Sequence, residues 1–278
     1  MSLKSSELFS IEGKTALLTG AGGFLGRTMA LALLENGARL IALGRSERFM
    51  DETAKWTDEF GAEWVHVVRV DMYENEQLEN ALRGVVKSER VDILVNNAHE
   101  LNENTGFNVS EGSLEKGSFD VWMRNLTGSV CWPAITTKII GTDMKSRGKG
   151  SIINISSMYA LVAPSPLLYE ETEFINPPAY SAAKAGMLAL TRYTASFWGR
   201  YGVRANAMLP GPFSNTEDNG PNSVGDDDPF LRRLHDRTCL GRTGGAKELA
   251  RPLIFLSSDA SSYMTGHALT VDGGWTII

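Results

Sequence analysis

Cysteine is scarce in this sequence. The two cysteines, Cys131 and Cys239, stand far apart, and neither belongs to a C-x-x-C pair or lies beside a histidine cluster. This pattern argues against both a disulfide framework and a zinc site. We therefore expect no bound metal and a reducing compartment, the cytoplasm.

Long apolar runs and clusters of positive charge are also absent. No run approaches the ~20 apolar residues of a transmembrane helix, and residues 1–10 lack the apolar core of a signal peptide. The formal net charge is −6, and the lysines and arginines are dispersed. Without a basic stripe, neither nucleic acid nor an anionic membrane is an expected partner. A small-molecule substrate is the partner that we expect.

What the sequence does contain is a regular alternation of strand-like and helix-like segments. Its 278 residues, 42% of them hydrophobic, suffice for one large α/β domain spanning residues 1–278. Short apolar runs separated by helical-length segments predict a Rossmann-like, doubly wound, parallel seven-stranded sheet with helices on both faces. The runs cover residues 15–19, 39–43, 64–70, 91–96, 151–156, 203–209 and 267–271. Two connecting loops, 99–118 and 212–238, are unusually long, which favours a functional role.

A glycine-rich loop, TGAGGFLG, occupies residues 19–26 between the first expected strand and a helix beginning near Phe24. Gly20, Gly23 and Gly26 form G-x-x-G-x-x-G, whereas the pattern T-G-x-x-x-G-x-G would require glycine in place of Phe24. In this position a glycine loop lets the backbone approach a pyrophosphate, which the helix N-terminus then attracts. The loop is therefore expected to bind a dinucleotide.

The end of the second expected strand bears on which dinucleotide is bound. An Asp or Glu there would hydrogen-bond the adenosine ribose and favour NAD, but this sequence has Gly44, Arg45 and, nearby, Arg48. A guanidinium suits a 2′-phosphate, so we expect NADP, with NAD as the alternative. Arg45 could instead stack on adenine or face solvent.

Tyr180 and Lys184 are spaced four residues apart, which places both on one face of a helix. A lysine ammonium beside a phenol is expected to lower its pKa and make the tyrosine a general acid/base. The pair follows an expected strand that ends at Ser156 and Ser157, and the turn LPGP follows the next strand.

Together these motifs resemble the short-chain dehydrogenase/reductase family, in its single-domain branch, over nearly the whole chain. The resemblance is carried by TGAGGFLG (19–26), VDM (70–72), NNAH (96–99), NLTG (125–128), NISS (154–157), YSAAK (180–184), PGPF (210–213) and GRTGGAKELARPLIFLSSDASSYMTGHALTVDGG (241–274). The last segment is the most specific of them.

The resemblance implies a role for each matching residue. Tyr180 matches the general acid/base, and Lys184 the residue that binds the nicotinamide ribose and lowers the tyrosine pKa. Ser157, rather than Ser156, matches the serine that binds the substrate oxygen, and Asn125 the asparagine of a water-mediated proton relay. The expected cofactor-binding residues are Gly20, Gly23, Phe24, Leu25, Gly26, Arg45, Asp71, Met72, Asn97, Ala98, His99, Tyr180, Lys184, Pro210, Gly211 and Phe213.

Three features depart from the pattern of that branch. Phe24 replaces a glycine of the fingerprint. His99 replaces the glycine of NNAG, so it either presents an imidazole towards the active site or lies at the surface without a catalytic role. The segment 158–179 between Ser157 and Tyr180 is longer than usual.

This insertion leads directly to Tyr180 and is expected to form part of the substrate wall. It contains carboxylate, amide and aromatic side chains that suit a polyhydroxylated ligand: Tyr169, Glu170, Glu171, Glu173, Phe174 and Asn176. A solvated acidic excursion or a subunit contact is the alternative. With the long loop after NNAH, it resembles dehydrogenases linked to bacterial surface-sugar or flagellin-glycan modification.

The sequence thus predicts an NAD(P)(H)-dependent oxidoreductase that interconverts a secondary alcohol and a ketone on a polar or carbohydrate-like substrate. The glycine pattern also resembles sugar-nucleotide epimerases and dehydratases, against which PGPF and the VDGG ending argue. A non-catalytic NADP(H)-binding sensor or scaffold is a third possibility. Two apolar sides on the helix after Tyr180 predict a homodimer or homotetramer.

Overall fold

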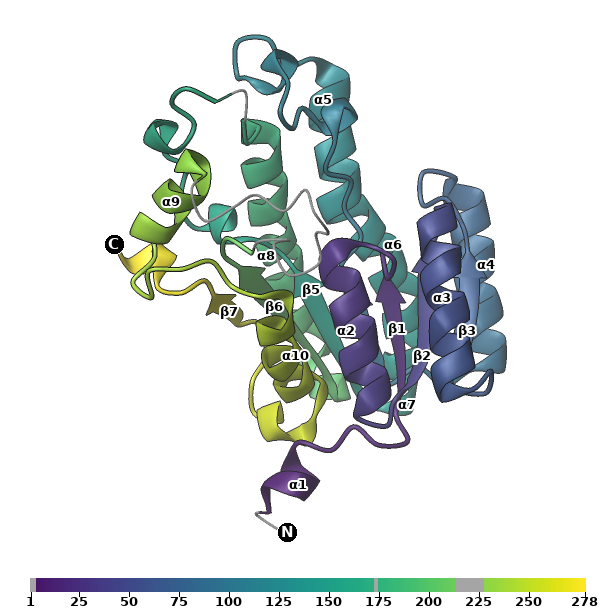
Figure 1. The fold of residues 1–278 in the computed structure, drawn as a ribbon. Coiled ribbons are helices and arrows are strands. Elements are labelled where there is room, and N and C mark those ends of the chain that lie inside the picture. The colour runs from purple at the N-terminus through teal and green to yellow at the C-terminus, as the bar shows by residue number, and fades with distance from the viewer. Residues whose placement is uncertain (1–3, 173–174, 214–227) are drawn as a thin grey trace.

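A seven-stranded parallel sheet forms the centre of the protein (Figure 1). The computed structural model describes residues 4–172, 175–213 and 228–278. The strands are β1 (Thr15–Thr19), β2 (Arg39–Gly44), β3 (Val65–Arg69), β4 (Ile93–Asn96), β5 (Gly150–Ile155), β6 (Val203–Pro210) and β7 (Ala268–Val271). Each expected run overlaps one of these strands, and the predicted fold class is confirmed.

The sheet order is β3-β2-β1-β4-β5-β6-β7, with every neighbouring pair parallel. From β1 the chain adds β2 and β3 on one side, and it then returns to the other side of β1 to add β4 to β7. The switch point of the sheet therefore lies between β1 and β4. At such a switch point the loops leaving the two strands diverge, and a crevice opens at their carboxyl ends.

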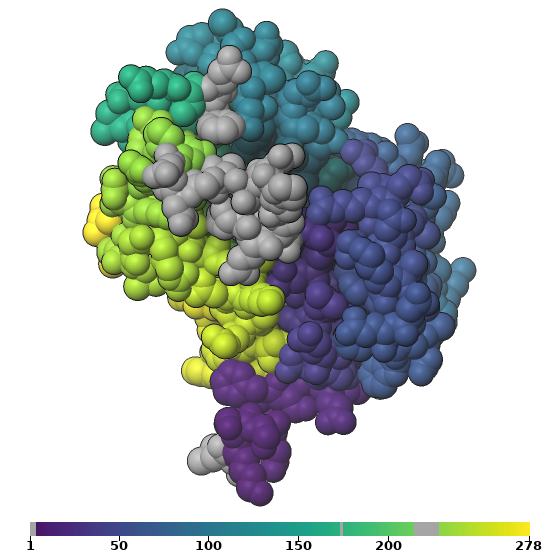
Figure 2. All heavy atoms as spheres, viewed as in Figure 1, coloured from purple at the N-terminus to yellow at the C-terminus, as the bar shows by residue number. Residues whose placement is uncertain are grey.

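Helices cover both faces of the sheet (Figure 1). The core on one face includes side chains of α2 (Phe24–Glu35), α3 (Glu47–Phe60) and α10 (Ala250–Ser257). The core on the other face includes side chains of α4 (Asn75–Ser88), α6 (Trp132–Thr136), α7 (Thr142–Arg147) and α8 (Pro178–Trp198). Two further helices are α9 (Pro229–Asp236) and the short α1 (Ser5–Leu8), which projects away from the body (Figure 2).

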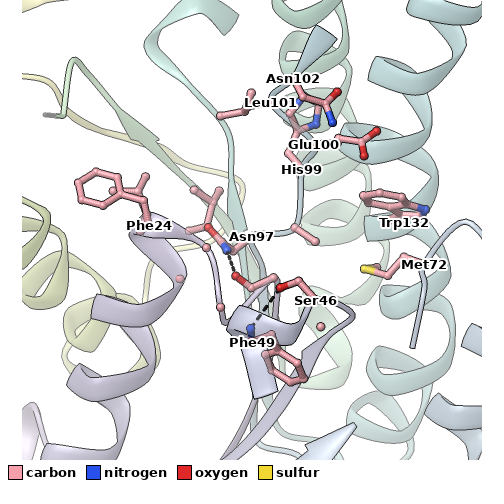
Figure 3. Close-up of a pocket in the computed structure, with 18 of the residues that line it drawn as sticks. Phe24, Ser46, Phe49, Met72, Asn97, His99, Glu100, Leu101, Asn102 and Trp132 are labelled. Atoms are coloured by element: carbon pink, nitrogen blue, oxygen red, sulfur yellow. Dashed lines mark hydrogen bonds between the residues drawn. The ribbon is translucent and has the colours of Figure 1, made fainter. Parts of the chain in front are cut away.

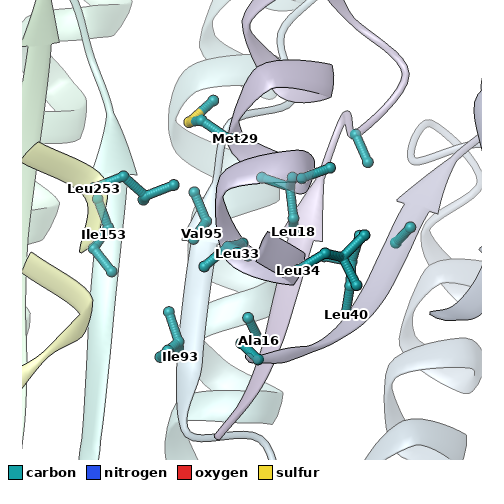
Figure 4. Close-up of a cluster of buried hydrophobic side chains, with 14 of the residues drawn as sticks. Ala16, Leu18, Met29, Leu33, Leu34, Leu40, Ile93, Val95, Ile153 and Leu253 are labelled. Atoms are coloured by element: carbon teal, nitrogen blue, oxygen red, sulfur yellow. The ribbon is translucent and has the colours of Figure 1, made fainter. Parts of the chain in front are cut away.

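The helix α2 shows how the sequence builds these layers. Its apolar residues Met29, Leu33 and Leu34 are buried against β1, β4 and their neighbours (Figure 4). The helix ends where Gly37 adopts a left-handed conformation, with φ of +77°. There the Gly37 and Ala38 amides donate to the Leu34 and Leu33 carbonyls, which satisfies two groups that a helix end leaves open.

One long helical segment precedes β5. It begins with α5 (Phe119–Leu126) and reaches α7 through two π-helical stretches, Thr127–Cys131 and Thr137–Gly141, that flank α6. Such stretches occur often at functional sites.

A buried chain of polar side chains ties this segment to the sheet and to α8. The Thr136 hydroxyl donates to Asn96 Oδ1 (2.6 Å), Asn96 Nδ2 donates to Asn154 Oδ1 (2.8 Å), and Asn154 Nδ2 donates to Thr191 Oγ1 (2.8 Å). All four side chains are buried, so each bond satisfies a polar group that would otherwise be costly to bury. These side-chain hydrogen bonds hold α6, β4, β5 and α8 in one arrangement.

The described ranges contain no helix with the length and apolar character needed to cross a bilayer.

Candidate active site

A cavity of about 570 Å³ opens at the carboxyl ends of the central strands (Figure 3). Every one of the expected cofactor-binding residues lines it, from the glycine loop to Phe213. Three of the four expected catalytic residues, Ser157, Tyr180 and Lys184, also line it, whereas Asn125 does not. The fold thus brings together residues that the sequence separates by up to about two hundred positions.

The glycine turn permits a close crossing of backbones. Gly20 has φ of +66°, and a Cβ on it would lie 2.8 Å from the Ala98 Cα. A Cβ on Gly26 would lie 2.1 Å from the Gly20 carbonyl oxygen. Both positions therefore exclude any larger residue.

Phe24 is the first residue of α2, and Gly23 precedes it as the N-cap without a side-chain hydrogen bond to the helix. The first amide groups of α2 consequently lack a side-chain cap, and residues Gly23 to Gly26 line the cavity. An uncapped helix N-terminus beside a cavity is suited to an anion such as a pyrophosphate. The departure at Phe24 leaves this feature intact.

Asn97 joins the glycine turn to the end of β4. Its Nδ2 donates to the carbonyl oxygens of Thr19 and Gly20, both at 3.1 Å, and the Asn97 and Ala98 amides donate to Thr19 Oγ1. These bonds hold the two strand ends at the switch point in a fixed relation.

Arg45 is held between two carboxylates. Its Nη1 lies 2.8 Å from Asp71 Oδ2, and its Nη2 lies 2.6 Å from Glu100 Oε1. Glu100 also accepts hydrogen bonds from the Tyr73 hydroxyl (2.8 Å) and from Arg124 (3.3 Å). Burial and Glu100 raise the pKa of Tyr73 to about 12. Arg45 therefore does not simply face solvent, and an incoming phosphate would compete with two carboxylates for it.

Tyr180, Lys184 and Ser157 meet at the inner end of the cavity. Lys184 Nζ donates to the Ile155 carbonyl (2.9 Å) and lies 5.5 Å from the centroid of the Tyr180 ring. The Ser156 hydroxyl donates to the Lys184 carbonyl (2.9 Å), so it serves a structural hydrogen bond. The Ser157 Oγ instead accepts from the Tyr159 amide (3.2 Å), and the Ser157 side chain acts to lower the pKa of Tyr180.

The electrostatics of this pair differ from the sequence expectation. Burial raises the pKa of Tyr180 to about 12, and the hydrogen bond from Ser157 opposes the shift only in part. Burial also lowers the pKa of Lys184 to about 7, so its ammonium is partly lost near neutral pH. The expected lowering of the Tyr180 pKa by Lys184 is not seen, because desolvation disfavours the charged form of both groups.

Asn125 lies behind the cavity, in the last turn of α5, and is fully buried. Its Nδ2 donates to the Val121 and Thr105 carbonyls, while its Oδ1 has no partner among the described residues. His99 lines the cavity and is not a surface residue. Of the two alternatives for His99, the structure therefore shows the one in which the imidazole faces the site.

In its described part, the insertion 158–179 packs against α9 and in the apolar cluster that also contains Tyr180. Tyr169 lies against Phe230 of α9, with ring centroids 6.0 Å apart, and Glu170 and Glu171 are exposed. None of the described residues in this range lines the cavity. That the insertion forms part of the substrate wall stays a prediction. Glu173, Phe174 and residues 214–227 of the other long loop lie outside the described ranges.

Several lining residues escaped the sequence reasoning: Ser46, Phe49, Glu100, Leu101, Asn102 and Trp132. Two glycines give an indirect indication of Phe49. A Cβ on Gly22 or Gly44 would lie 2.7 Å from Phe49, so both positions leave room for it. Glu100 follows NNAH directly, but its contact with Arg45 spans 55 positions and could not be anticipated.

A doubly wound α/β fold with a glycine turn, a helix N-terminus and a buried tyrosine–lysine pair at the switch point defines a class of oxidoreductases. Comparison with known proteins specifies the family. A family model described as enoyl-(acyl carrier protein) reductase matches residues 20–276. The chain belongs to the short-chain dehydrogenase/reductase family and is an enzyme of that family.

Among similar proteins, 2-dehydro-3-deoxy-D-gluconate 5-dehydrogenase of Bacillus subtilis (strain 168) is 31% identical, with 97% of each chain covered. Gluconate 5-dehydrogenase of Gluconobacter oxydans (strain 621H) is 30% identical, with 98% of each covered. A crystal structure of a gluconate 5-dehydrogenase from Burkholderia cenocepacia J2315, in complex with NADP and tartrate, has a TM-score of 0.83 at 30% identity, covering 99% of this chain and 100% of that one. The likeness to surface-sugar or flagellin-glycan enzymes stays a prediction.

The glycine turn generates a first prediction. Gly26→Ala should abolish binding of NADPH and destabilise the fold, because the new methyl group would overlap the Gly20 carbonyl. Gly84→Ala in α4 is the control, since nothing lies within 4 Å of its Cβ position. Isothermal titration with NADPH and thermal unfolding measure both effects. Unchanged affinity in Gly26→Ala would show that the turn does not carry the nucleotide.

Proposed function

We propose that this protein is an NADP(H)-dependent oxidoreductase that interconverts a secondary alcohol and a ketone on a polar, carbohydrate-like small molecule. The convergence of Ser157, Tyr180 and Lys184 on the cavity that the glycine turn opens is the observation that carries the proposal. The similar proteins named for gluconate and its 2-dehydro-3-deoxy derivative make sugar acids the first substrate class to test.

The residues divide the work as follows. Ser157 donates a hydrogen bond to the oxygen of the substrate carbonyl and orients it. During reduction, Tyr180 transfers its proton to that oxygen, and in oxidation the phenolate takes the proton back from the alcohol. Lys184 binds the nicotinamide ribose, and Asn125 supports the path by which the proton is exchanged with water. The nicotinamide, when bound, supplies or accepts the hydride.

The raised pKa of Tyr180 sets the direction of the pH dependence. Below a pKa of about 12 the phenol holds its proton, so the acid needed for ketone reduction is present at neutral pH. Alcohol oxidation needs the phenolate, whose fraction grows as pH rises towards that pKa.

Tyr180→Phe tests the catalytic role. Removing the hydroxyl should lower kcat by about 10²- to 10⁴-fold, the usual contribution of a positioned acid/base. Tyr263→Phe is the control, because Tyr263 is exposed and does not line the cavity. Absorbance of NADPH and NADH would be followed with a panel of keto-sugar acids and sugar alcohols.

Each outcome of that screen has a distinct meaning. Full activity in Tyr180→Phe would contradict the mechanism. Tight binding of NADPH by the wild type, with no turnover of any carbonyl compound, would favour the sensor or scaffold.

The preference for NADP(H) is tested at Arg45. Arg45→Ala should raise the KM for NADPH about tenfold or more, the effect of one lost charged hydrogen bond, and leave the KM for NADH nearly unchanged. Arg48→Ala is the control, because Arg48 is exposed and does not line the cavity. Equal effects on the two cofactors would contradict a phosphate-binding role.

We also propose that the protein forms a homodimer or homotetramer through α8. Tyr193 and Phe197 stack with centroids 4.3 Å apart on its outer side, and they are 59% and 56% exposed. Light scattering should show a particle of at least twice the 30.3 kDa chain mass, and Phe197→Glu should reduce it to the monomer. A wild-type particle of the chain mass would refute this assembly.

A further inference from the structure

His99 lies against the proposed catalytic tyrosine. The centroids of the His99 and Tyr180 rings are 5.2 Å apart, with their planes at 62°. Phe107 makes a second contact of this type, at 5.1 Å and 81°. Edge-to-face pairs at these distances are favourable, so two ring contacts define the orientation of the phenol.

The imidazole is itself held in place. Its Nδ1 lies 3.1 Å from Ser129 Oγ, in the π-helical stretch between α5 and α6, and Ser129 is fully buried. A Cβ on the neighbouring Gly128 would lie 2.8 Å from the same Nδ1. The ring therefore occupies a space that exists only because residue 128 is glycine.

The second nitrogen is buried as well. His99 Nε2 has no hydrogen-bond partner among the described residues, and neither does Oδ1 of Asn125. The two side chains nevertheless act on each other, because the Asn125 side chain raises the pKa of His99.

The surroundings keep the imidazole neutral. Burial and the charge of Lys184 hold the pKa of His99 well below 6.5, and the Asn125 side chain opposes this only weakly. From α8, the Tyr180 ring contacts the imidazole and the charge of Lys184 acts on it. Tyr159 interacts with Tyr180 from the 3-10 turn after β5.

The adjacent residue along the chain, Glu100, does not supply a counter-charge to the imidazole. Its carboxylate is taken up by Arg45, Arg124 and the Tyr73 hydroxyl. The imidazole thus meets the phenol as a neutral ring.

We propose that His99 is a positioning residue for Tyr180: a neutral imidazole, anchored by Ser129, that packs edge-on against the phenol and keeps water from it. This inference rests on the proposed catalytic role of Tyr180. It gives the residue at position 99 a task that a glycine at that position could not perform, since glycine has no side chain to cover the ring.

A measurement without turnover tests the state of the imidazole. The chain has four histidines, so ¹⁵N-histidine NMR with the variant His99→Ala assigns one of them. The His99 signal should stay that of a neutral, hydrogen-bonded imidazole from about pH 5 to about pH 8, where an ordinary histidine titrates. An ordinary titration midpoint near 6.5 would overturn the proposal even if no substrate is found.

Steady-state kinetics test the positioning. His99→Ala should lower kcat about tenfold and change the KM for NADPH by a smaller factor, because the phenol loses its orientation while the other nucleotide contacts remain. The apparent pKa for alcohol oxidation should fall, since water admitted beside Tyr180 relieves the burial that raises its pKa. A residue with only a structural role would lower the thermal stability without moving that pKa.

Two further variants keep the test decisive if His99→Ala fails to fold. His99→Phe still covers the phenol but cannot bond Ser129, so it should recover part of the kcat that His99→Ala loses. Ser129→Ala should lower kcat in the same direction as His99→Ala, and the double variant should be no slower than His99→Ala alone. His66→Gln on β3 is the control and should leave all parameters unchanged.

The outcomes separate the two proposals. Wild-type kcat and pH profile in a folded His99→Ala, or additive losses in the double variant, would overturn the role of His99. Inactivity of the wild type on every substrate would instead remove the proposed function, and the NMR result would still report on the imidazole.

Discussion

The close crossing of the glycine turn with the loop that leaves β4 is the constraint on which the site depends. The backbone at Gly20 passes so near Ala98 that a single methyl group would not fit between them. This contact and the hydrogen bonds of Asn97 to the turn fix the start of the loop after β4, and with it the position of His99 and Glu100. It also starts α2 with its uncapped amides at the cavity. The nucleotide end and the catalytic end of the site are therefore positioned by one crossing.

Burial governs the charges around this cavity. The phenol of Tyr180, the amine of Lys184 and the imidazole of His99 all shift towards their neutral forms, because each is removed from water. At the other end, Arg45 remains charged but is matched by two carboxylates. These residues therefore present little uncompensated charge to the cavity before a charged ligand binds. An anionic dinucleotide and an anionic sugar acid would each alter that balance.

The three departures from the family pattern lie in different places relative to the site. Phe24 leaves the first amide groups of α2 uncapped, because the N-cap residue is Gly23, which has no side chain to bond them. The described part of the insertion packs on α9 and shares an apolar cluster with Tyr180. His99 lines the cavity and contacts the Tyr180 ring directly.

Periodicity and motif spacing by themselves predicted the strands, the sheet class, the glycine loop and the Tyr180–Lys184 pair, and the family resemblance added the other expected site residues. They could do so because apolar runs, tight glycine turns and helical i,i+4 pairs are local patterns with local physical causes. Only the tertiary structure decided that Glu100 holds Arg45, that burial rather than Lys184 controls the pKa of Tyr180, and that His99 is enclosed by Gly128 and Ser129. Those facts depend on distances between residues remote in sequence and on the exclusion of water from a packed interior. No local pattern encodes either.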